Sequence, residues 1–62
     1  MEGTVKWFNE SKGYGFIAGD DNMDYFVHVS QLPEGGLNEN DRVTFDTAKT
    51  DRGMQAQNVN LA

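Results

Sequence analysis

Two short segments of the chain alternate aromatic residues with small or aliphatic residues at the two-residue period of a β-strand. Residues 12–17 read KGYGFI, and residues 25–29 read YFVHV. Side chains two positions apart share one face of a strand. If the two segments pair as neighbouring strands, their rings therefore gather on one face of a sheet. The rings on that face are those of Tyr14, Phe16, Phe26 and His28.

This aromatic face has two interpretations. The rings could fill the interior of a barrel, but Gly15 and its aliphatic neighbours would then make a poor outer surface. Alternatively the rings are exposed, and a contiguous exposed apolar patch usually has a binding role. Rings edged by Lys6 and Lys12 suit stacking on unpaired nucleobases, because every base has a π-face. The residues therefore favour a surface that binds single-stranded nucleic acid.

Trp7 is a further candidate for this surface, but its neighbour complicates the assignment. Lys6 and Trp7 are consecutive, so a regular strand would direct them to opposite faces. Only a bend or a β-bulge would bring both side chains to one surface. The residues by themselves leave this question open.

Length and composition restrict the class of protein. The chain has 62 residues, no cysteine and one histidine. We therefore expect one small domain, residues 1–62, without a disulfide, a metal site or a cofactor. No apolar run reaches the length of a membrane span, and the beginning of the chain lacks the pattern of a signal peptide. These features predict a soluble cytoplasmic monomer with no membrane partner and no small-molecule substrate.

The net charge of −5 is unusual for a nucleic-acid-binding protein. Its distribution is uneven, since residues 1–17 carry two lysines and two glutamates and are neutral. Residues 18–62 carry eight acidic residues against three cations, which accounts for the whole excess. We therefore expect binding to depend more on stacking than on attraction to phosphate.

Turn signals divide the chain into short segments rich in β-branched and aromatic residues. No segment has helical periodicity, apart from one helical turn that is expected near residues 30–32. This spacing predicts an all-β sandwich or barrel, and with five strands in 62 residues a closed or nearly closed barrel would remove exposed strand edges. The predicted strands are residues 3–9, 14–19, 23–29, 41–48 and 53–61. The predicted turns are residues 9–13, 19–22, 33–36 and 50–53.

The predicted interior of this barrel is small. It consists of the aliphatic and aromatic side chains that alternate away from the ring face. The expected members are Val5, Ile17, Val27, Val29, Leu32, Leu37, Val43, Phe45, Ala56, Val59 and Leu61.

Four segments together resemble the bacterial cold-shock proteins, small nucleic-acid-binding barrels related to the OB-fold. The resemblance covers nearly the whole chain and implies a five-stranded antiparallel β-barrel, similar to the OB-fold, that binds single-stranded RNA and single-stranded DNA with low sequence selectivity. It also implies an RNA chaperone that prevents or melts secondary structure, with effects on transcription and translation. The matching segments are residues 3–9 (GTVKWFN), 12–17 (KGYGFI), 26–28 (FVH) and 55–59 (QAQNV).

The resemblance also implies which residues contact nucleic acid, and it favours Trp7 on the binding face. Phe8 is the weakest member, because its ring could lie half in the core. The residues carried over by position are Lys6, Trp7, Phe8, Lys12, Tyr14, Phe16, Phe26 and His28.

The chain departs from the family pattern at four places. The loop after Ser30 is shorter than usual and lacks an aromatic residue, and Leu37 is the nearest apolar one. Val29 stands where many members carry a ring. The shorter loop and Val29 therefore both remove stacking surface from one end of the aromatic face. Tyr25 occupies an inward position, where its hydroxyl must find a partner or solvent. Met54 stands where proline is common.

Other function classes are less consistent with these residues. A protein-interaction module could use the same rings, and the acidic charge favours it mildly. An enzyme is disfavoured, because His28 has no evident nucleophile or orienting partner. Oligosaccharide binding by a similar barrel is disfavoured by the paired lysines. Residues 20–24 resemble part of a calcium loop through Asp20, Asp21, Asn22 and Asp24, but the glycine and distal glutamate of that loop are absent, so we expect a solvated turn.

Overall fold

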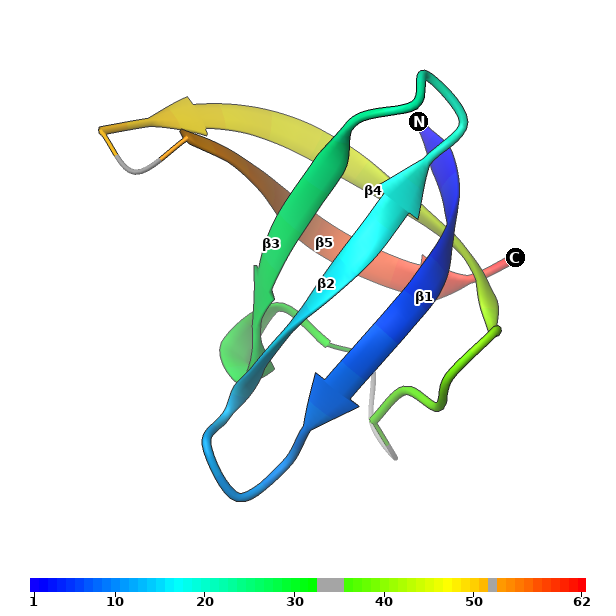
Figure 1. The fold of residues 1–62 in the computed structure, drawn as a ribbon, viewed down its shortest axis with the longest axis vertical. Helices are drawn as coiled ribbons and strands as arrows, with labels where there is room; N and C mark the ends of the chain where they lie inside the picture. Colours follow the sequence, from blue (N-terminus) through cyan, green and yellow to red (C-terminus); the bar gives the residue numbers. More distant parts are fainter. Residues whose placement is uncertain (33–35, 52) are drawn as a thin grey trace.

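Five strands form a closed barrel (Figure 1). The computed structural model describes residues 1–32, 36–51 and 53–62. The elements in chain order are β1 (Glu2–Asn9), β2 (Tyr14–Gly19), β3 (Asp24–His28), the 3-10 turn η1 (Val29–Gln31), β4 (Arg42–Thr50) and β5 (Gly53–Leu61). The five predicted strands are confirmed to within a few residues, and η1 is the single helical turn expected near residues 30–32.

The strand order around the barrel is β1–β2–β3–β5–β4, and β4 pairs with β1 to close it. A closed ring with an odd number of strands cannot alternate direction at every pairing, so one pair must be parallel. That pair is β3 and β5, which meet through Phe26 with Gln55 and Val27 with Ala56. The predicted five-stranded OB-fold-like barrel is confirmed, with antiparallel pairing everywhere except at this junction.

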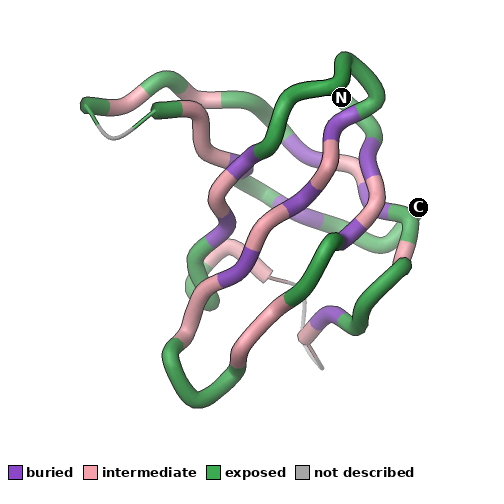
Figure 2. The backbone as a smooth tube through the Cα atoms, viewed as in Figure 1, coloured by how far each residue is buried: buried purple, intermediate pink, exposed green. Residues whose placement is uncertain are grey.

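Buried side chains line the inside of the barrel. Figure 2 shows buried positions alternating with less buried ones along β2 and β3, which is the period of a strand. Most of the predicted interior is confirmed by this pattern. The buried hydrophobic residues are Val5, Ile17, Tyr25, Val27, Leu37, Val43, Phe45, Ala56 and Val59.

Two predicted core residues are exposed. Val29 is 47% exposed, because β3 ends at His28 and the backbone turns into η1, which interrupts the alternation that placed Val27 inside. Leu61 is 58% exposed, because it is the last residue of β5 and lies at the end of the barrel. Leu32 is intermediate, since it packs against the core while remaining partly accessible.

The turn between β2 and β3 is held by its acidic residues. Asp20 binds Arg42 of β4 through two hydrogen bonds of 3.0 Å. The Tyr25 hydroxyl donates to the carboxylate of Asp21, as its inward position requires, and the Tyr25 ring packs on Phe45 at a centroid distance of 5.1 Å. The turn is solvent-exposed as expected, but two of its carboxylates have protein partners.

Two predicted turns extend beyond the described residues. Residues 33–35 of the loop after η1 and Arg52 of the β4–β5 turn fall outside them. Leu37, in the described part of this loop, is 4% exposed and belongs to the core, so it does not replace the missing ring on the surface. Among the described residues, no helix has the length and apolar character needed to cross a membrane.

Candidate nucleic-acid interface

A β-bulge in β1 brings Lys6 and Trp7 to the same surface. Val5 pairs with Ile17 and Trp7 pairs with Phe16, so Lys6 is an extra residue without its own partner in the register. Lys6 is exposed, and Trp7 is 38% exposed although Val5 before it is fully buried. The bulge therefore answers the question that the consecutive Lys6 and Trp7 left open.

Strand register aligns the rings in two rows across the barrel wall. Directly paired residues on neighbouring strands project from the same face of a sheet. The first row runs from β1 to β5 through Trp7, Phe16, Phe26 and Gln55. The second row runs from β1 to β3 through Asn9, Tyr14 and His28.

Four of these rings touch one another and form what we call the ring cluster: Trp7, Tyr14, Phe16 and Phe26. Their centroids lie 5.4–5.8 Å apart in four pairs, within the range of favourable aromatic contacts. Tyr14 and Phe26 are nearly parallel, with an interplanar angle of 24°, whereas Trp7 meets Tyr14 edge to face at 68°. The cluster is therefore a continuous apolar surface with ring faces in several orientations.

The ring cluster lies outside the barrel core. Tyr14, Phe16 and Phe26 are partly exposed, while the residues that alternate with them along β2 and β3 are buried. Among the latter is Gly15, where a Cβ atom would lie 2.4 Å from the carbonyl oxygen of Trp7. Only glycine permits this close approach of β1 and β2 beneath the rings. The interpretation that placed the rings inside the barrel is therefore wrong.

Phe8 and His28 differ from the ring cluster in their surroundings. Phe8 pairs with Gly15 and packs against the core, so its ring lies on the inner side of the strand and not in the ring cluster. His28 is exposed at the end of β3, and its Nδ1 accepts a 3.1 Å hydrogen bond from the Ser30 backbone N–H. In the neutral ring the proton is then on Nε2, which can donate to a ligand.

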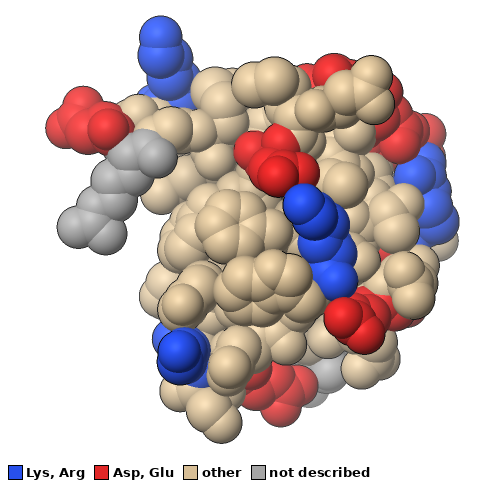
Figure 3. Space-filling view, viewed as in Figure 1, with Lys and Arg blue, Asp and Glu red and all other residues tan. Residues whose placement is uncertain are grey.

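Charged residues lie at the border of the ring cluster. Figure 3 shows a continuous uncharged area over β2 and β3, with basic and acidic side chains around it. Lys6 Nζ lies 3.2 Å from the carboxylate of Asp24, and both side chains are about half exposed. Lys12 is exposed in the turn between β1 and β2. Because exposed ion pairs are weak, Lys6 can exchange Asp24 for a phosphate.

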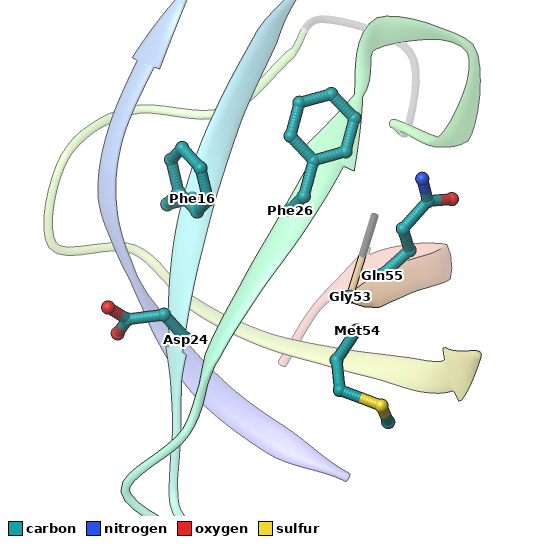
Figure 4. A pocket seen from close by; sticks show the side chains of 6 residues that line it. All are labelled: Phe16, Asp24, Phe26, Gly53, Met54 and Gln55. Carbon is teal, nitrogen blue, oxygen red and sulfur yellow. The ribbon is translucent and has the colours of Figure 1, made fainter. Parts of the chain in front are cut away.

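A pocket of about 310 Å³ adjoins the ring cluster where β3 and β5 diverge (Figure 4). We call it the β3–β5 pocket, and it is lined by Phe16, Asp24, Phe26, Gly53, Met54 and Gln55. Sequence reasoning did not identify Asp24, Met54 or Gln55 as site residues. The pairing of Phe26 with Gln55 joins distant segments, so no local pattern could have indicated it.

The clearest electrostatic effects lie in the turn beside this surface. The hydrogen bond from Arg42 lowers the pKa of Asp20, and the same contact raises the pKa of Arg42. The hydrogen bond from the Tyr25 hydroxyl lowers the pKa of Asp21 and raises the pKa of Tyr25. Both contacts favour ionised carboxylates and so stabilise the turn at neutral pH.

Acid is expected to remove the stabilisation that Asp21 and Tyr25 provide. Because folding lowers the Asp21 pKa below 3.8, the stabilisation is present above that pH and is lost as the pH falls below it. The urea midpoints of wild type and Tyr25→Phe should therefore differ at neutral pH and converge as the pH falls well below 3.8. Val27→Ala, which removes no ionisable contact, is the control, and its difference from wild type should not vanish in acid in this way. An equal difference for Tyr25→Phe at neutral pH and in acid would contradict this assignment.

The described residues include no group of His, Cys, Asp or Glu side chains suited to holding a metal ion. The chemistry that the surface offers is stacking on partly exposed rings, hydrogen bonding from His28 and Gln55, and attraction of phosphate to Lys6 and Lys12.

Comparisons with known proteins point to one family. The family model described as the 'Cold-shock' DNA-binding domain matches residues 1–62. Cold shock protein 1 of Lactiplantibacillus plantarum is 57% identical over 60 residues, which cover 92% of this chain and 91% of that protein. The major cold shock protein of Micrococcus luteus is 57% identical over 61 residues, covering 92% and 91% of the two chains. Cold shock protein CspC of Bacillus subtilis is 47% identical over 64 residues, which cover 98% of this chain and 97% of that protein.

The sequence, the five-stranded barrel and these matches agree, and the chain belongs to the cold-shock domain family.

Proposed function

We propose that this protein binds single-stranded RNA and single-stranded DNA with low sequence selectivity, by stacking bases on the ring cluster. The observation that carries the proposal is the bulge at Lys6, which adds Trp7 to three rings on the outside of the barrel. A regular strand would have turned one of Lys6 and Trp7 away. The family description supports nucleic acid as the class of ligand.

Stacking supplies most of the binding free energy in this mechanism. Successive bases lie on Trp7, Tyr14, Phe16 and Phe26, with His28 at the end of the second row. Each stacked base contributes about 1–3 kcal/mol, so a few occupied subsites give micromolar or better affinity. Lys6 and Lys12 hold the phosphate backbone, and Phe8, which packs against the core, is the weakest member of the site. Stacking reads π-faces that all bases share, which explains low selectivity.

This mode of binding makes the protein an RNA chaperone without catalysis. The protein binds an open strand and not a closed hairpin, so mass action shifts RNA toward the open form. No catalytic step is needed. A cytoplasmic monomer that affects transcription and translation through RNA structure remains our prediction.

The stacking surface is shorter at the end near η1. Val29 is 47% exposed there, and its backbone N–H donates to the carbonyl oxygen of Gly13 at 2.9 Å. An aliphatic side chain at this place offers no ring to a base. We propose that the strand therefore occupies fewer subsites than in relatives that carry a ring at this position.

Single strands are expected to bind at least about tenfold more tightly than a duplex of the same length, because a duplex hides its base faces. Titrations with dT, dA, rU and duplex oligonucleotides, followed by Trp7 emission, test this directly. Binding should quench Trp7, and the single-stranded oligonucleotides should differ little from one another. Equal affinity for the duplex, or unchanged emission at saturation, would contradict the proposal.

A protein-interaction module is the second candidate, and the net charge of −5 favours it. A partner peptide with basic and aromatic residues could use the same rings. The titration above separates the two functions, because a protein-interaction module would not bind the oligonucleotides.

A further inference from the structure

Met54 lines the β3–β5 pocket together with rings of the ring cluster. It is the second residue of β5 and pairs with Lys49 of β4, while the next residue, Gln55, pairs with Phe26 of β3. The β3–β5 pairing extends only to Phe26 and Val27, so the preceding part of β5 stands apart from β3. Met54 occupies this gap and packs partly against the core (Figure 4).

The other two methionines of the chain lie elsewhere. Met1 is 48% exposed and Met23 is 50% exposed, and neither lines the β3–β5 pocket. Met54 is less exposed, but a pocket of about 310 Å³ gives small solutes access to it. A change at Met54 would alter a wall beside Phe16 and Phe26, whereas the same change at Met23 would alter only the surface of a turn.

We propose that Met54 is a site of reversible oxidation by peroxides, and that its sulfoxide weakens binding of single-stranded nucleic acid. The inference rests on the function proposed above. In the reaction the thioether sulfur attacks one peroxide oxygen, an S–O bond forms and the O–O bond breaks. With hydrogen peroxide, the transferred oxygen gives its proton to the other oxygen, which leaves as water, so sulfur is oxidised and the peroxide is reduced.

The sulfoxide changes the pocket in two ways. It places a strongly polar oxygen on a wall that borders Phe16 and Phe26, where a stacked base would otherwise meet an apolar thioether. It also adds volume and polarity to a side chain that packs against the core, which shifts the beginning of β5 and disturbs the adjoining pairing of Gln55 with Phe26. Both effects disturb a base bound over Phe26, whereas Trp7 and Tyr14 keep their places.

Peroxide treatment of the intact chain tests the proposal, with Met54→Leu as the resistant variant and Met23→Leu as the matched control. Mass spectrometry of peptides locates the added oxygen, and anisotropy with labelled dT6 measures affinity before and after treatment. Oxidised wild type and oxidised Met23→Leu should bind dT6 about threefold or more weakly, because one stacking subsite is partly lost. Met54→Leu should keep its own affinity, and methionine sulfoxide reductase should restore the wild type.

Three results would overturn the inference while leaving the proposed function intact. They are an unchanged affinity with Met54 fully oxidised, an equal loss in Met54→Leu, and an unreacted Met54 when Met23 is fully converted. Circular dichroism of the oxidised protein excludes unfolding as the cause, and an unfolded spectrum would also overturn the pocket assignment. Failure of the untreated wild type to bind dT6 would instead reject the proposed function itself, together with this inference.

Discussion

Phe26→Ala is expected to weaken oligonucleotide binding by about 1–3 kcal/mol, because it removes one stacking platform. Phe26 contacts Tyr14 and Phe16 and borders the β3–β5 pocket. Its ring is partly exposed, so the loss of stability should stay well below the roughly 3–5 kcal/mol of a buried phenylalanine. Fluorescence titration and urea unfolding measure the two effects separately.

Val27→Ala is the matched control for this experiment. Val27 follows Phe26 on β3 but is fully buried on the opposite face. Its replacement should lower the free energy of unfolding and leave the affinity of the folded fraction unchanged. If Phe26→Ala behaved in the same way, with normal binding by the molecules that remain folded, Phe26 would be a structural residue and the stacking proposal would lose its central platform.

Local alternation predicted most of this fold, since it depends only on neighbouring residues. The period of two in residues 12–17 and 25–29 placed Tyr14 and Phe26 on one face and Ile17 and Val27 on the other, and the structure confirms both assignments. The same rule failed where a strand ended. Val29 continues the pattern in sequence, but the 3-10 turn changes its direction and exposes it.

The parts of the site that could not be predicted depend on contacts between distant segments. The bulge at Lys6 is defined by how β1 pairs with β2, so consecutive Lys6 and Trp7 left two outcomes open until the resemblance favoured one. Asp24 looked like a solvated turn residue, because its partner Lys6 lies far away in the sequence. Gln55 joins the row of rings only through the parallel β3–β5 pairing.

Ile17→Ala is expected to destabilise the fold by about 2–5 kcal/mol, the range for large-to-small changes in a core. Ile17 is fully buried, and a Cβ atom at Gly3 would lie only 2.8 Å from its Cγ2, so the side chain packs directly on the β1 backbone. The backbone cannot collapse into the cavity that alanine leaves. Because a core of this size rarely supplies more than about 3–5 kcal/mol in total, much of the variant should be unfolded at room temperature.

Leu61→Ala provides the comparison, because alternation predicts both residues inside the barrel and the structure buries only Ile17. With Leu61 58% exposed at the end of β5, its replacement should change the free energy of unfolding by no more than about 0.5 kcal/mol. Urea unfolding followed by circular dichroism measures both variants. Comparable losses for the two would mean that β5 packs its last residues against the core, and the exposed position assigned to Leu61 would be wrong. A large loss confined to Ile17→Ala would instead show that the stability of the barrel depends on its small interior and not on the exposed end of β5.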